Sequence, residues 1–85
     1  MGHRELAQTM RHLPGRYTGR LGPRTLRRVT NAAAAGQFER AVEQLIRSLH
    51  VRAEPVTTGE RDELRAVLEA MNMPDDRIDG LAVQR

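Results

Sequence analysis

Two amphipathic helices and the turn between them are encoded by residues 36–73, GQFERAVEQLIRSLHVRAEPVTTGERDELRAVLEAMNM. In the first half, apolar residues recur every three or four positions, while Gln44 and the charged residues take the opposite face. This spacing predicts a helix over Phe38–Leu49. The same spacing in the second half predicts a helix over Glu60–Met71. The fold class is therefore all-α.

The segment between these two helices carries its own stop and start signals. Pro55 disfavours helical backbone at the residue before it, so the first helical region ends there. Thr57 with Glu60 three residues later is the pattern of a capping box, in which each side chain bonds the other residue's backbone N–H. After the second helix, Asn72 suits a C-terminal cap, and Pro74 follows soon after.

Two further helices are predicted in the N-terminal part of the chain. Apolar residues at helical spacing indicate the first over His3–Leu13, and Pro14-Gly15 ends it. Glycines make residues 16–22 a loop. Pro23 suits the first position of the second helix, which runs to Ala35, because its missing N–H would be unpaired there anyway.

At the other end, Pro74-Asp75-Asp76 opens a short fifth helix that carries Ile78 and Leu81, and we expect residues 83–85 to be frayed. We therefore predict one small all-α domain over residues 1–85, a four-helix bundle with a short fifth C-terminal helix. Residues 1–31 form its basic part and residues 36–81 its amphipathic helical core. The residues expected inside are Leu6, Met10, Leu26, Val29, Phe38, Ala41, Val42, Leu45, Ile46, Leu49, Leu64, Val67, Leu68 and Met71.

Composition places limits on the kind of protein. The chain has no Cys, which excludes a disulfide scaffold and a thiolate metal site. Its first residues lack the apolar stretch of a signal peptide, and no apolar run approaches the roughly 20 residues that span a bilayer. We expect a cytoplasmic protein without membrane contact. The small core also makes a homodimer a reasonable arrangement.

Charge is divided unevenly along the chain. Residues 1–31 hold seven Arg and one acid, whereas residues 32–85 hold seven Arg and ten acids. The basic end is a candidate nucleic-acid or anion site, in which arginines would bind phosphates and the single tyrosine would stack on a base. A solvated face or a contact with an acidic protein is the alternative. The residues of this candidate site are Arg16, Tyr17, Arg20, Arg24, Arg27 and Arg28.

Catalytic and metal-binding patterns are weak. Ser48 falls inside a predicted helix, away from any nucleophile elbow, and the three histidines are far apart. Asp75, Asp76 and Asp79 cluster as ligands of a hard metal would, but negative charge in the first turn of a helix explains them better. We expect no enzymatic activity, no catalytic residue, no bound metal and no cofactor.

A family resemblance adds a functional expectation. The first long helix begins with Gly36 and Phe38 and continues with Ala41 and Leu45. The turn has Pro55, Val56 and Thr57, and the second helix carries Leu64, Leu68, Met71 and Met73. With this pattern, residues 31–81 resemble the small helical immunity proteins of bacterial polymorphic and contact-dependent toxin systems, in particular the MafI-like group.

The resemblance implies a non-catalytic interaction protein, an immunity protein or antitoxin that binds a cognate bacterial toxin and neutralises it by occlusion. The acidic helices supply candidate residues for that contact: Glu39, Glu43, Glu60, Glu63 and Glu69. Two alternatives stay open. One is a small nucleic-acid-binding module that uses the N-terminal arginines, and the other is an adaptor or regulatory subunit of a larger enzyme.

Overall fold

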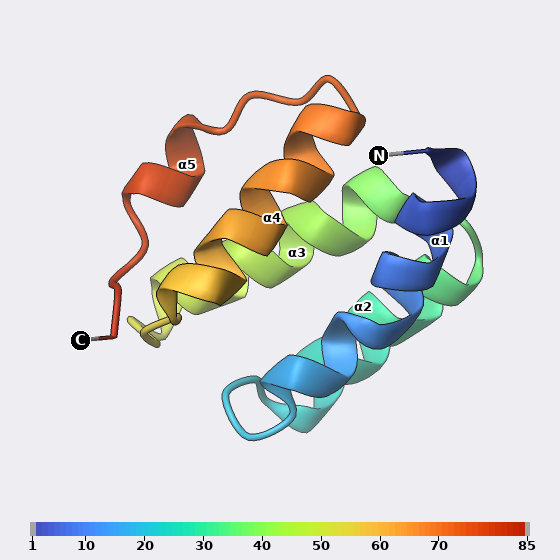
Figure 1. Ribbon diagram of the computed structural model, residues 1–85. Coiled ribbons are helices and arrows are strands. Elements are labelled where there is room, and N and C mark those ends of the chain that lie inside the picture. Colours follow the sequence, from blue (N-terminus) through green and yellow to red (C-terminus); the bar gives the residue numbers. More distant parts are fainter. Residues whose placement is uncertain (1, 85) are drawn as a thin grey trace.

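A computed structural model describes residues 2–84 and confirms the all-α fold class (Figure 1). Each predicted helix is present, with ends within two residues of the prediction. A short 3-10 helix, η1, follows the first helix and overlaps the start of the predicted loop. The elements are α1 (His3–His12), η1 (Pro14–Tyr17), α2 (Pro23–Ala34), α3 (Phe38–Val51), α4 (Thr58–Ala70) and α5 (Asp76–Asp79). Within residues 2–84, each helix is too short or too polar to cross a bilayer.

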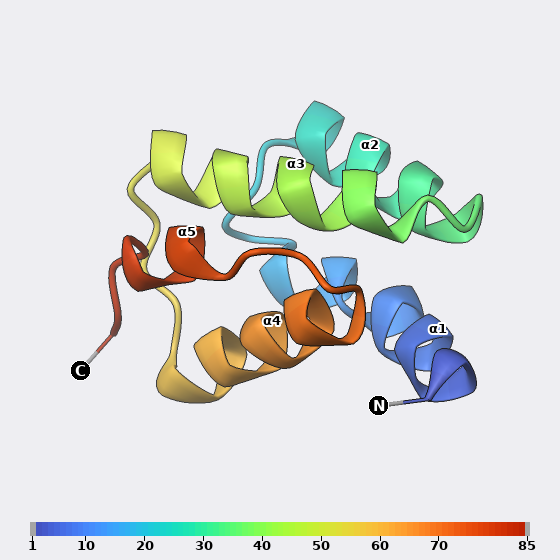
Figure 2. The same cartoon turned by 90° about the horizontal axis from the view of Figure 1, so that it is seen from above.

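The helices form two layers. Helices α2 and α3 lie side by side as an antiparallel hairpin, and α1 and α4 form the layer that faces them (Figure 2). Helix α5 lies beside α4 and α3 at the edge of the molecule. The backbone carbonyl oxygen of Arg77 in α5 lies 2.9 Å from the imidazole Nε2 of His50, which links α5 to the end of α3.

The core fills the space between the layers, largely as predicted. Of the residues expected inside, only Leu26, Phe38 and Met71 are partly exposed at its margin. Several further residues, most of them from short connections, are also buried. These are Leu13, Tyr17, Leu21, Ala32, Val56, Ile78 and Leu81.

Helices α2, α3 and α4 share one way of ending. The residue after the C-cap takes a left-handed backbone conformation: Gly36 with φ 79°, Ala53 with φ 51° and Asn72 with φ 55°. The next backbone N–H then donates to the carbonyl oxygen five residues earlier, at 2.9–3.1 Å. This is the Schellman motif, which satisfies carbonyl groups at a helix end. Asn72, the predicted C-terminal cap, lies one residue after the C-cap Met71 and supplies the left-handed conformation of the motif.

The start of α4 is fixed by the predicted capping box. The backbone N–H of Glu60 donates to the Thr57 hydroxyl at 3.0 Å, and the backbone N–H of Thr57 donates to the Glu60 carboxylate at 2.9 Å. Two otherwise unpaired N–H groups of the first turn are thereby satisfied.

The C-terminal segment is held in place as far as Gln84, so the expectation of fraying is wrong for residues 83 and 84. Val83 forms a parallel β-bridge with Val56 in the connection between α3 and α4. The N–H of Val56 donates to the Ala82 carbonyl at 2.8 Å, and the N–H of Gln84 donates to the Val56 carbonyl at 2.7 Å. Residue 85, which was also expected to fray, lies outside the described residues.

Candidate interaction surfaces

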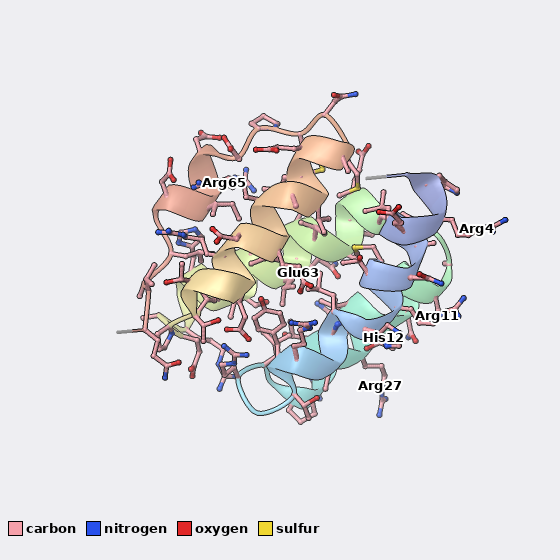
Figure 3. The ribbon with its side chains drawn as sticks, viewed as in Figure 1. Arg4, Arg11, His12, Arg27, Glu63 and Arg65 are labelled. Carbon is pink, nitrogen blue, oxygen red and sulfur yellow. The ribbon has the colours of Figure 1, made fainter. Side chains whose placement is uncertain are left out.

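Arg20 lies at the centre of a charged cluster between η1 and the start of α4. Its guanidinium donates to both carboxylate oxygens of Glu60, to Oε1 at 2.7 Å, and also to the Arg16 carbonyl at 2.7 Å. The Arg16 guanidinium in turn lies 3.5 Å from the Glu63 carboxylate. Glu63 sits on the part of α4 that adjoins η1 (Figure 3). We call this set of residues, completed by Tyr17, the Arg20 cluster.

Tyr17 is the buried member of the Arg20 cluster. Its side chain has no exposed surface, and the guanidinium carbon of Arg20 lies 4.6 Å from its ring centroid. Burial, reinforced by the charge of Glu60, raises the pKa of its hydroxyl. The expected role of Tyr17 as a stacking platform for a base is therefore wrong, because Arg20 and the core cover the ring.

Both charges of the central pair persist over a wide pH range. Hydrogen bonds from Arg20 lower the pKa of Glu60 to about 2, against the opposing effect of burial, and the Thr57 backbone N–H lowers it further. The same hydrogen bond raises the pKa of Arg20. At neutral pH the two charges neutralise each other, so neither is free to attract a ligand.

The predicted anion site is consequently divided. Arg16, Tyr17 and Arg20 turn toward α4, whereas Arg24, Arg27 and Arg28 are exposed on α2. The ion pairs formed among residues 2–84 involve none of these three α2 arginines. Figure 3 shows Arg27 pointing outward from α2, and Arg4 and Arg11 pointing outward from α1.

The predicted acidic site is divided in the same way. Glu60 and Glu63 belong to the Arg20 cluster, while Glu39, Glu43 and Glu69 are exposed. Glu39 and Glu43 line an open hollow of about 680 Å³ at the start of α3, which we call the α3 hollow. Leu6 of α1, Phe38 of α3 and Met71 after α4 supply its apolar surface.

A smaller hollow of about 240 Å³ adjoins the α3 hollow, since Glu43 lines both. Its apolar surface comes from Ile46, Leu68, Met73 and Pro74. One side of α3 therefore presents two neighbouring hollows with apolar walls and carboxylates at their margins. One arginine also lines each hollow, Arg40 the larger and Arg77 the smaller.

Asp75 and Asp79 of the predicted acidic cluster pair with an arginine of α4. Arg65 extends from α4 toward α5, with guanidinium nitrogens 3.6 Å from the Asp75 carboxylate and 2.7 Å from that of Asp79 (Figure 3). A search of the described residues finds no set of three or more His, Cys, Asp or Glu side chains that could hold a metal ion. Charge pairing and apolar contact are the chemistry that these surfaces offer.

Comparison of the chain with models of protein families, with curated proteins and with solved structures gives no match. The resemblance to immunity proteins thus stays a prediction from the sequence.

Sequence reasoning missed the pairing inside the Arg20 cluster. Arg20 and Glu60 are 40 positions apart, and local spacing carries no signal for a contact between such distant residues. The capping box of Thr57 and Glu60 was the available signal, because it places the Glu60 carboxylate at the start of α4.

Proposed function

We propose that this protein is a non-catalytic binding domain that docks a partner protein on the side of α3 lined by Glu39 and Glu43. The α3 hollow carries the proposal, because it combines apolar surface from Leu6, Phe38 and Met71 with two exposed carboxylates. Arg40 also lines this hollow, so the carboxylates outnumber the guanidinium group by two to one. Unbranched methionine side chains adapt readily to different partner surfaces. A matching partner surface would bring apolar side chains surrounded by lysine or arginine.

Within this class, we propose an immunity protein or antitoxin that acts in the cytoplasm by occluding a cognate toxin. Support comes from the residues that carry the family resemblance. Phe38 and Met71 line the α3 hollow, and Met73 lines the adjoining one. The partner in this proposal is a toxin with a basic and apolar surface near its active site.

The test uses charge reversal at Glu43, the residue shared by both hollows. Wild-type protein, Glu43→Arg and the control Asp62→Arg are used to capture proteins from nuclease-treated extract of the native cell, with quantification by mass spectrometry. Asp62 is an exposed acid of α4 outside both hollows, so the two variants carry the same change in charge. We expect one stoichiometric partner that Glu43→Arg loses and Asp62→Arg retains.

The captured protein is then expressed alone and together with wild-type protein. Growth arrest that co-expression relieves would support the immunity role. A partner enzyme that keeps its activity in the complex would contradict that role and favour an adaptor. A set of captured proteins that does not differ between the two variants would overturn the docking surface itself.

A further inference from the structure

The α2–α3 hairpin holds a second groove, of about 360 Å³, which meets the α3 hollow at Gln37 and Arg40. Its charged lining residues are Arg28 of α2 and Arg40 of α3, and Asn31, Gln37 and Gln44 add amide groups. Among residues 2–84, no carboxylate lines it. Arg28, Asn31 and Arg40 are exposed, so the groove opens to solvent. We call it the α2–α3 groove.

Two further arginines extend the groove along the hairpin. Arg24 precedes Arg28 by one helical turn, and Arg47 follows Arg40 by two turns, so each shares a face with its neighbour. All four side chains are exposed, and none takes part in the ion pairs formed among residues 2–84. Two antiparallel helices thus carry two adjacent rows of unpaired guanidinium groups.

The groove lining favours a phosphate backbone over an acidic protein. Guanidinium groups donate paired hydrogen bonds to phosphate oxygens, and amide side chains donate further ones. Protein interfaces need large apolar or aromatic anchors at their centre, whereas Ala32 and Ala35 are the apolar residues here.

We propose that the α2–α3 groove binds the phosphate backbone of duplex nucleic acid without reading its sequence. A duplex fits better than a single strand, because single-strand binding depends on aromatic stacking. Tyr17 is buried, and Phe38 lines the α3 hollow but not the groove. This proposal extends beyond the proposed protein docking. The groove shares Gln37 and Arg40 with the α3 hollow, whereas Arg24 and Arg28 of α2 do not line that hollow, so variants of these two arginines test the groove alone.

The test measures fluorescence anisotropy of a labelled 20-base-pair DNA duplex over a range of salt concentrations. Four phosphate contacts predict that log Kd rises with log salt concentration with a slope of about 3.6. Two duplexes of unrelated sequence should bind within about twofold of each other, since phosphate contacts carry no sequence information. We expect Arg24→Gln/Arg28→Gln to lower the slope by about 2 and to weaken binding at least tenfold at 50 mM salt.

Arg4→Gln/Arg11→Gln is the matched control, because it removes two exposed α1 arginines that also form no ion pair among residues 2–84. An equal loss of binding in the control would mean that net charge, and not the groove, determines binding, and would overturn the proposal. Tighter binding of a poly-glutamate peptide than of the duplex would overturn it in favour of an acidic protein. Circular dichroism melting verifies that both variants fold. The Arg24→Gln/Arg28→Gln variant should still capture the same partner protein as the wild type, which would show that the groove and the docking surface act independently.

Discussion

Ala53 holds a backbone conformation that side chains disfavour. Its φ of 51° lies in the left-handed region, where a Cβ costs roughly 1 kcal/mol or more. Glycine avoids this penalty, although its greater freedom in the unfolded chain offsets part of the gain. We expect Ala53→Gly to raise the free energy of unfolding by about 0.5–1 kcal/mol, measured by urea denaturation.

Gly36 offers the reverse experiment at the end of α2. Its φ is 79°, and a Cβ added there would meet nothing within 4 Å, so any loss of stability comes from the backbone alone. Gly36→Ala should lower the free energy of unfolding by about 1 kcal/mol in the same denaturation series. Changes of the same sign in both variants would argue against left-handed strain as the cause.

At the scale of elements, the ion pairs of the Arg20 cluster link η1 and the following loop to α4. Glu60 has a folded pKa of about 2, below its ordinary value near 4.5, so its contribution to stability is complete above about pH 5. That contribution is lost as the pH falls from about 5 toward 2. We therefore expect the melting temperature of the wild-type protein to fall steeply over this range.

Glu60→Gln removes the titrating group and isolates its contribution. At pH 7 the variant should lose about 1.5–3 kcal/mol of stability, the typical value of a hydrogen bond to a charged group. Its melting temperature should depend less on pH between 5 and 2 than that of the wild type. The control is Asp62→Asn, which alters an exposed acid of the same helix. A pH profile of Glu60→Gln parallel to the wild type would contradict the role of the pair.

The helices could be predicted because their apolar spacing is a local property. Phe38 through Leu49 show a complete stripe, and α3 indeed spans that range. Tyr17 and Leu21 belong to η1 and the loop after it, where no period marks which side chain turns inward. Val56 is buried where residues 82–84 pair with it from the far end of the chain. Such contacts depend on the assembled fold, and neither segment indicates them alone.

At the scale of the whole molecule, the distribution of charge on the surface differs from its distribution along the chain. Along the chain, the basic end and the acidic remainder are two separate segments. In the fold, part of each is used for internal pairing in the Arg20 cluster. Arg28 of the basic segment and Arg40 of the acidic segment line the same groove of the hairpin.

The small core makes the whole fold sensitive to one buried side chain. Leu45 of α3 has no exposed surface. Replacing Leu45 with Ala should cost roughly 2–5 kcal/mol, a large share of the about 5–15 kcal/mol that stabilises a typical domain. Thermal melting followed by circular dichroism should show a strongly lowered or absent transition. An unchanged melting temperature would contradict the position of Leu45 in the core.

The tight turn between α2 and α3 has a consequence for the order of folding. Contacts that close short loops form fastest, because little chain entropy is lost before they form. Only the turn at Ala35, Gly36 and Gln37 separates α2 from α3, whereas Val56 must meet residues 82–84 after the whole of α4 and α5. The hairpin should therefore assemble early and the C-terminal pairing late. In pulsed hydrogen exchange during refolding, amides of α3 should gain protection before the amide of Gln84.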